Sequence, residues 1–363
     1  MRKIIFILIC FTSAKMFCIA QVEKPRLSFG GSVAQGNILS NSGDLSNSEI
    51  DRVKNLSVAI HWHHTDQETF NKYACFPKQT VSFSYYNFDN ALLGNGVVLA
   101  YTLAPHFLIT KHASLFPSIS VGGAVLSNPY STTQNPGNKL YSLPISAYLA
   151  LGGGFYFQFS SHWGFNTSVE FSHISNGGWK DPNNGLNWPQ LNIGVEYSPK
   201  ESSLKKLKRE INKGEPFKTL RGDITVFGLI RSGLLQNSEI NKPTLGIDLL
   251  LSKQIARIHA WTVGVELYQD QLVQKLLAAN NISSNGIRSG ALVGHEFLLN
   301  RFIFSQQLGV YLAGRYGAEL LYHRWGLQYS LTTRFRVGVN LRAYKSVAEF
   351  TDLRLSYSFL EKK

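Results

Sequence analysis

The stretch from Trp163 to Ser172 reads WGFNTSVEFS, and its side chains alternate in character. The odd-numbered positions are mostly apolar, whereas the even-numbered positions hold glycine, asparagine, serine and Glu170. A period of two is typical of a β-strand with two different faces. A soluble sandwich would also alternate. A charged residue in mid-strand and a length of about ten residues favour a strand of a transmembrane barrel, whose lumen is polar.

The same alternation recurs at 191–197, 261–267, 335–342 and 353–359. It predicts an all-β protein, an antiparallel transmembrane β-barrel with about sixteen strands. The last strand carries Tyr357 and Phe359 close to the C-terminus, which resembles the final strand of outer-membrane barrels. The predicted strands start near Arg26, Leu56, Thr80, Gly96, Ser118, Pro144, Trp163, Gln190, Leu220, Thr244, Arg257, Ala291, Phe302, Glu319, Arg334 and Asp352.

The predicted strands fall into two sets, at 21–198 and 220–363, separated by a linker at 199–219 that carries a run of charged residues. An even number of strands before the linker places it in the periplasm. The halves resemble each other weakly, with 163–175 matching 335–347 and 191–197 matching 353–359. The pattern fits two small barrels in tandem or one wide barrel made by duplication, and the sequence leaves both open.

Residues 1–20 have the form of a secretory signal peptide. Arg2 and Lys3 supply the positive start, Ile4–Phe11 the apolar centre, and Cys18-Ile19-Ala20 the small-residue cleavage site. The apolar run is shorter than the ~20 residues that a spanning helix requires. The sequence therefore predicts export, with the signal removed.

Composition narrows the class further. Charged residues make up 16% of the chain and aromatic residues 12%, which excludes a disordered chain. Past residue 20 no apolar run of about 18 residues occurs, which excludes a helical membrane protein. Signal removal lowers the formal net charge from +13 to +10 and leaves Cys75 as the only cysteine, so no intrachain disulfide can form. A basic exported protein is expected at an anionic membrane surface rather than on nucleic acid.

Two residues near the end of the 163–175 strand carry the candidate chemistry. His173 and Ser175 are two apart, so they share the face of Val169 and Phe171, which is predicted to face lipid. A neutral imidazole beside a serine can accept its proton while the oxygen attacks an ester carbonyl. The amides around Gly178 would stabilise the resulting oxyanion.

These residues belong to a longer motif: His173, Ser175 and Asn176, then Pro182-Asn183-Asn184-Gly185, then a strand ending in Tyr197. The motif resembles the signature of the lipid A 3-O-deacylases, the outer-membrane acyloxyacyl hydrolases. The resemblance implies an eight-stranded barrel in the bacterial outer membrane that removes an ester-linked 3-hydroxyacyl chain from lipid A of lipopolysaccharide in the outer leaflet. It places the oxyanion role on Asn176. It leaves the second half of the chain unexplained.

One position departs from the family pattern. The family has a catalytic glutamate two residues after the motif's glycine, where this chain has Asn187. An asparagine can orient the imidazole but supplies no counter-charge. Unless Pro189 causes a bulge, Asn187 shares the face of His173. Asp181, in the same loop, is the alternative acid, and Lys180 is a candidate ligand for a lipid A phosphate. Lys345 and Val347 replace the histidine and serine in the second copy, which predicts a site in the first half only.

Other readings remain at this stage. A phospholipase would use the same serine and histidine, and a non-catalytic barrel, a channel or adhesin, would keep only the scaffold. His61, His63, His64 and Asp66 cluster near a strand end but match no complete ligand set. No metal and no other cofactor is therefore predicted, and nothing in the sequence sets the oligomeric state.

Overall fold

The computed structural model describes residues 25–39, 52–201, 207–208, 219–235, 238–299, 301–316, 318–344 and 347–362. The predicted signal peptide, most of the charged linker and Lys345 lie outside the described residues. Val347 starts a strand, but its side chain is not among those described.

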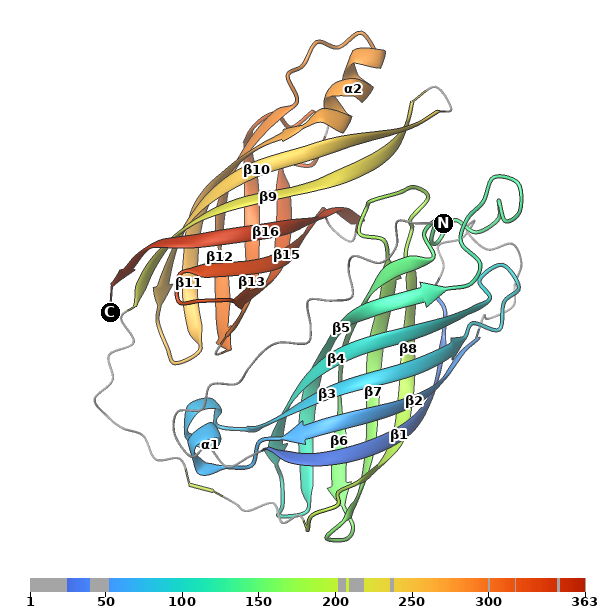
Figure 1. Ribbon diagram of the computed structural model, residues 1–363, viewed down its shortest axis with the longest axis vertical. Helices are drawn as coiled ribbons and strands as arrows, with labels where there is room; N and C mark the ends of the chain where they lie inside the picture. The colour runs from blue at the N-terminus through green and yellow to red at the C-terminus, as the bar shows by residue number, and fades with distance from the viewer. Residues whose placement is uncertain are drawn as a thin grey trace.

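The first half of the chain forms a closed barrel of eight antiparallel strands (Figure 1). Each strand pairs with the next one along the chain, and β1 pairs with β8 to close the sheet. A short helix, α1 (Gln67–Tyr73), connects β2 to β3. The strands are β1 (Arg26–Asn37), β2 (Arg52–His63), β3 (Phe76–Asn87), β4 (Asn95–Leu108), β5 (Ala113–Leu126), β6 (Ile145–Gln158), β7 (Trp163–Ser175) and β8 (Leu186–Tyr197).

The second half forms another closed eight-stranded barrel, in which β16 pairs with β9. Helix α2 (Gln271–Ala279) connects β11 to β12. The strands are β9 (Leu220–Leu235), β10 (Ser238–Gln254), β11 (His259–Asp270), β12 (Ile287–Leu299), β13 (Phe302–Ala313), β14 (Leu321–Ser330), β15 (Phe335–Tyr344) and β16 (Val347–Lys362). The all-β barrel prediction is confirmed, and the question left open by the sequence is answered in favour of two tandem barrels.

The alternation seen in the sequence separates the outer wall of each barrel from its lumen. In β7, Val169 on the odd-numbered row is 62% exposed, whereas Ser172 on the even-numbered row is fully buried. In β16, Leu353 and Leu355 are exposed, and Arg354 between them is buried. Exposed apolar rows on the outer wall are what a membrane-spanning strand requires, because lipid surrounds it.

Both lumens are filled by side chains, as expected for barrels of about eight strands. The half of the first lumen nearest to the β7–β8 loop holds an apolar and aromatic cluster that includes Tyr86, Tyr148 and Trp188. At the opposite end, the Glu196 carboxylate accepts hydrogen bonds from His63 and Lys78. Of the residues that the sequence grouped near this strand end, His61 and His63 therefore belong to a packed polar network around Glu196, whereas Asp66 caps α1. No group of three metal-binding side chains occurs among the described residues.

The second lumen is filled by arginine–carboxylate pairs. Arg342 contacts Glu266 at 2.5 Å, and Arg324 bridges Glu266 at 2.6 Å and Asp248 at 2.9 Å. Arg354 joins the same network through Asp248. A void of about 20 Å³ remains among these side chains.

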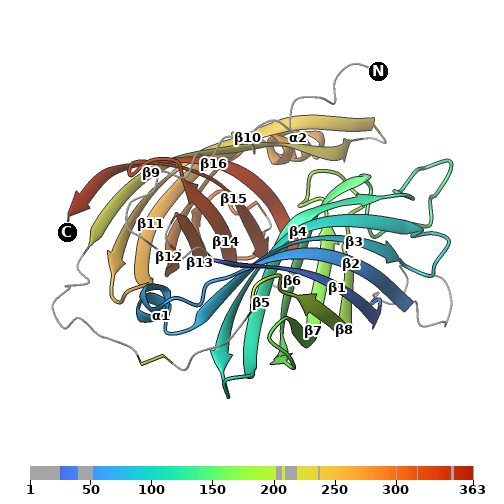
Figure 2. The same cartoon turned by 60° about the horizontal axis from the view of Figure 1, so that its bottom comes forward.

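The two barrels lie next to each other with the same orientation (Figures 1 and 2). At one end, Arg257 in the β10–β11 turn donates to the Asn71 carbonyl of α1. At the other end, the β7–β8 loop meets β16, where Thr351 N donates to Gly177 O at 2.9 Å. Each contact joins strand ends or loops that must lie on the same side of a membrane, so one bilayer can hold both barrels. Neither helix in the described ranges is long and apolar enough to cross a membrane.

Candidate active site

Three side chains form a hydrogen-bonded row at the end of β7 and the start of β8. His173 Nε2 is 2.8 Å from Ser175 Oγ, and His173 Nδ1 is 2.7 Å from Asn187 Oδ1. His173 and Asn187 are direct partners in the β7–β8 ladder, which shows no bulge at Pro189. All three residues therefore stand on the outer wall, in the row that also carries exposed Phe171.

The hydrogen bonds of Asn187 fix the tautomer of His173. Asn187 Nδ2 points to the Gly185 carbonyl at 3.4 Å, so its Oδ1 faces the imidazole. An oxygen there can only accept, which makes His173 Nδ1 the donor. Nε2 is then unprotonated and accepts the hydrogen of Ser175. This is the protonation state in which the imidazole acts as a general base toward serine.

Gly185 packs directly against the imidazole. It has a φ of +80°, and a Cβ built there would lie 2.6 Å from His173 Cε1. Its amide donates to Leu140 O at 2.9 Å, which ties the β7–β8 loop to the β5–β6 loop. A glycine is required here both for its left-handed backbone and for its close approach to the ring.

Asn176 organises the turn that follows Ser175. Its Oδ1 accepts from Trp179 N at 3.0 Å, while its Nδ2 donates to Ser142 Oγ at 3.0 Å and Lys180 O at 2.6 Å. Its backbone amide donates to Asn183 Oδ1 at 3.0 Å. The side-chain donors of Asn176, which the resemblance assigned to the oxyanion, are thus already bonded to Ser142 and Lys180. Ser142 was not identified from the sequence, because this residue lies in the β5–β6 loop and is not part of the motif.

The structure brings only part of the predicted set together. Asp181 is exposed on the loop, and no described hydrogen bond joins it to His173, whereas Asn187 makes that contact. Lys180 lies on the same loop with its backbone carbonyl bonded to Ser142 and Asn176. Gly178 follows the serine by three residues and has a φ of +77°.

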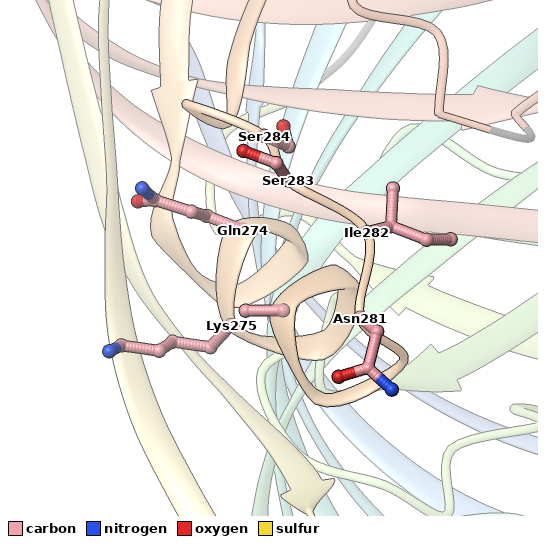
Figure 3. A pocket seen from close by; sticks show the side chains of 7 residues that line it. Gln274, Lys275, Asn281, Ile282, Ser283 and Ser284 are labelled. Carbon is pink, nitrogen blue, oxygen red and sulfur yellow. The ribbon is translucent and has the colours of Figure 1, made fainter.

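Two other features of the molecule, Cys75 and a pocket beside α2, contain no serine paired with a histidine. Cys75 is buried beside α1, and burial raises the pKa of its thiol to about 11, so at neutral pH it is not a thiolate nucleophile. A pocket between α2 and the loop after it is lined by side chains such as Gln274, Lys275 and Asn281 (Figure 3). It belongs to the second barrel, and none of its lining residues is in the row of Asn187, His173 and Ser175.

Two family models match the chain, one in each half. The model described as "Lipid A 3-O-deacylase (PagL)" matches residues 56–196, which include the whole hydrogen-bonded row. The model described as "Acyloxyacyl hydrolase, C-terminal domain" matches residues 220–362, the second barrel. None of the curated protein sequences gives a significant match.

Three solved structures each match about half of the chain. The crystal structure of the outer membrane enzyme PagL matches with 19% identity and a TM-score of 0.33, covering 46% of this chain and 97% of that one. Neisserial surface protein A matches with 11% identity and a TM-score of 0.33, covering 47% and 96%. Ail of Yersinia pestis matches with 16% identity and a TM-score of 0.30, covering 48% and 98%.

The family models thus account for both barrels of the chain. The chain belongs to the lipid A 3-O-deacylase family, the acyloxyacyl hydrolases of the bacterial outer membrane.

Proposed function

We propose that this protein is an outer-membrane serine esterase that removes the ester-linked 3-hydroxyacyl chain from lipid A of lipopolysaccharide. The observation that carries the proposal is the row Asn187–His173–Ser175, which is joined by contacts of 2.7 and 2.8 Å on the outer wall of the first barrel. An esterase of soluble substrates would have little use for a nucleophile on a wall that faces lipid.

The wall next to the row suits an acyl chain. Leu149 is the ladder partner of His173 on β6, and exposed Leu151 and Phe171 continue the apolar surface toward the middle of the strand. A lipid that lies in the outer leaflet would run its acyl chains along this surface. Its ester groups, near the head group, would then lie level with Ser175 at the strand end.

Catalysis would proceed through an acyl-enzyme. Ser175 Oγ attacks the ester carbonyl as its proton passes to His173 Nε2, and the sugar oxygen leaves with that proton. Water then attacks the acyl-serine, again with His173 as base, and releases the 3-hydroxy fatty acid. Asn187 holds the imidazole in the tautomer that this sequence requires, but it offers no negative charge to the imidazolium.

We assign the oxyanion to the main-chain amide of Gly178 rather than to the Asn176 side chain. The side-chain donors of Asn176 are used by Ser142 and Lys180. Backbone N–H groups in a turn after the nucleophile are frequent oxyanion donors. Lys180, two residues further on, would bind a phosphate of the glucosamine disaccharide.

The test is mass spectrometry of lipid A from cells that express the wild-type protein, the Ser175→Ala variant or neither. The wild type should remove one hydroxyacyl mass, whereas Ser175→Ala and His173→Ala should lower the rate by about 10³-fold or more. Heat-modifiable gel mobility would show that each variant has folded. Unchanged lipid A together with lysophospholipid would indicate a phospholipase instead, and full activity of Ser175→Ala would refute the assignment of the nucleophile.

A further inference from the structure

In the second barrel, the pairing between β9 and β16 that closes the sheet does not extend to the end where the active site lies, and the unpaired stretch between these two strands is called the seam below. The pairing of β16 with β9 runs from Lys362↔Leu220 to Leu353↔Gly228 and stops there. Strand β9 nevertheless continues to Leu235, and β16 begins at Val347. The end of β9 (229–235) and the start of β16 (347–352) therefore each have a backbone edge that the other strand does not pair.

The turn that follows the nucleophile occupies this seam. Ser232 N, on the β9 edge, donates to Trp179 O at 2.9 Å. Thr351 N, on the β16 edge, donates to Gly177 O at 2.9 Å. Trp179 Nε1 donates in turn to Thr351 O at 3.1 Å. The site turn, Gly177–Trp179, thus supplies main-chain partners to both edges, in the manner of a peptide added to a sheet.

The two glycines of the site turn allow this close approach. A Cβ at Gly177 would lie 2.5 Å from Thr351 Oγ1, and a Cβ at Gly178 would lie 2.5 Å from Glu349 O. Both residues have positive φ, at 66° and 77°. Neither position can hold a larger residue without moving the turn out of the seam.

The first barrel holds the same turn from its other side. Asn176 Oδ1 accepts from Trp179 N, and Asn176 Nδ2 donates to Lys180 O. Asn176 directly follows Ser175, so the nucleophile and the amide of Gly178 are on one short segment fixed at both sides. A turn held from only one side would sample more conformations, and a displacement of about 1 Å in a catalytic group can cost about 100-fold in rate.

We infer that the second barrel is a positioning partner for the active site, and that Ser232 and Thr351 act through their main-chain amides to hold the site turn in its catalytic geometry. The inference rests on the proposed function, because it concerns the same nucleophile. It gives the second half of the chain a role in the reaction, although that half contributes no triad residue.

The test removes the two amides without removing the barrel. Ser232 and Thr351 direct their N–H groups toward the turn and away from β10 and β15, so Ser232→Pro and Thr351→Pro delete these bonds and no ladder bond. Ser232→Ala and Thr351→Ala keep the amides and are the matched controls. With purified full-length protein in micelles, the proline variants should lose about 10- to 100-fold in kcat with KM nearly unchanged, and the alanine variants should retain wild-type kinetics.

Emission from Trp179, obtained by subtracting the spectrum of the matching Trp179→Phe protein, gives a readout independent of catalysis. It should move to longer wavelength in the proline variants as the indole leaves the seam. If the prolines prevent folding, Gly177→Ala, whose added Cβ would lie 2.5 Å from Thr351 Oγ1 and push the turn away from β16, should show the same loss of kcat and the same spectral shift.

Each outcome of these experiments either supports or overturns the positioning role. Wild-type kcat in a folded proline variant, an equal loss in the alanine controls, or a change confined to KM would overturn the positioning role while leaving the esterase proposal intact. A wild-type protein that deacylates nothing would refute the proposed function, and this inference with it.

Discussion

Asn187 lies directly opposite His173 in the β7–β8 ladder, with its Oδ1 atom 2.7 Å from His173 Nδ1. The contact occupies the place where a triad would have its carboxylate. It orients the imidazole as a carboxylate would, yet in the proposed mechanism it would leave the imidazolium without a counter-charge. In a low-dielectric site, a carboxylate would stabilise the imidazolium much more than an asparagine does, because charge–charge interactions are screened weakly there.

Substitutions at Asn187 should therefore change the rate in opposite directions. We expect Asn187→Ala to lower kcat by about 100-fold, because alanine cannot hold His173 in the required tautomer. Asn187→Glu should raise kcat by about tenfold, because the carboxylate would stabilise the protonated imidazole. In Asn187→Glu the acid limb of the pH–rate profile should move to higher pH, since a carboxylate stabilises the protonated imidazole. Asp181→Ala is the control and should be neutral; if it abolishes activity while Asn187 variants do not, the loop aspartate is the acid.

Gly185→Ala should misplace the imidazole without unfolding the barrel. The added methyl group would lie 2.6 Å from His173 Cε1, so the ring must turn away from Ser175. We expect a loss of about 10- to 100-fold in kcat. Gly286→Ala is a matched control because Gly286 also has a positive φ, at 71°, but lies in the second barrel's β11–β12 loop. Equal losses in both variants would point to general backbone strain rather than to the ring.

Lys180→Gln should weaken the binding of phosphorylated lipid A only. A lysine that contacts a phosphate contributes about 1.5–3 kcal/mol through a charge-assisted hydrogen bond, so KM should rise about tenfold. The rate with enzymatically dephosphorylated lipid A should not change. Lys275→Gln, on exposed α2 of the second barrel, is the comparison. The same rise in KM with both lipids would exclude phosphate recognition by Lys180.

Arg342→Met should destabilise the second barrel. The Arg342 side chain is 0% exposed and pairs with Glu266, which is 0% exposed as well. Removing one partner of a buried pair commonly costs about 3–5 kcal/mol, and the denaturant midpoint in micelles should fall accordingly. Adding Glu266→Leu should recover part of the loss. A single variant as stable as the wild type would show that Arg324 alone satisfies the Glu266 carboxylate.

Much of the fold follows from side-chain alternation, because each strand has one lipid-facing and one lumen-facing row. The predicted starts at Arg26, Trp163, Leu220 and Phe302 match those of the structure. Strand β8 begins at Leu186, earlier than the predicted Gln190, because the pleat passes through Pro189 without a bulge. The same continuity confirms that Asn187 shares the outer face with His173.

Closure into two barrels could not be predicted, because it depends on whether β8 pairs with β1 or with β9. Both arrangements satisfy the same alternation, so no row of side chains distinguishes them. The contacts of the site turn with β9 and β16 could not be predicted either, for a related reason. Ser232 and Thr351 meet it through main-chain amides, and a backbone group leaves no signature in the choice of residue. The engagement of Asn176 with Ser142 likewise depends on a loop packing that residue types do not encode.

The filled interiors bear on how the proposed site can work from the outer wall. Among the described residues of the second barrel, the arginine–carboxylate network leaves a void of about 20 Å³, room for about one water molecule, and aromatic side chains close the first barrel. The described side chains thus fill the two lumens as plugs, unlike the water-filled lumen of a porin. If the proposed function holds, a barrel of this kind modifies the surface lipid from its outer wall and needs no open channel through its centre.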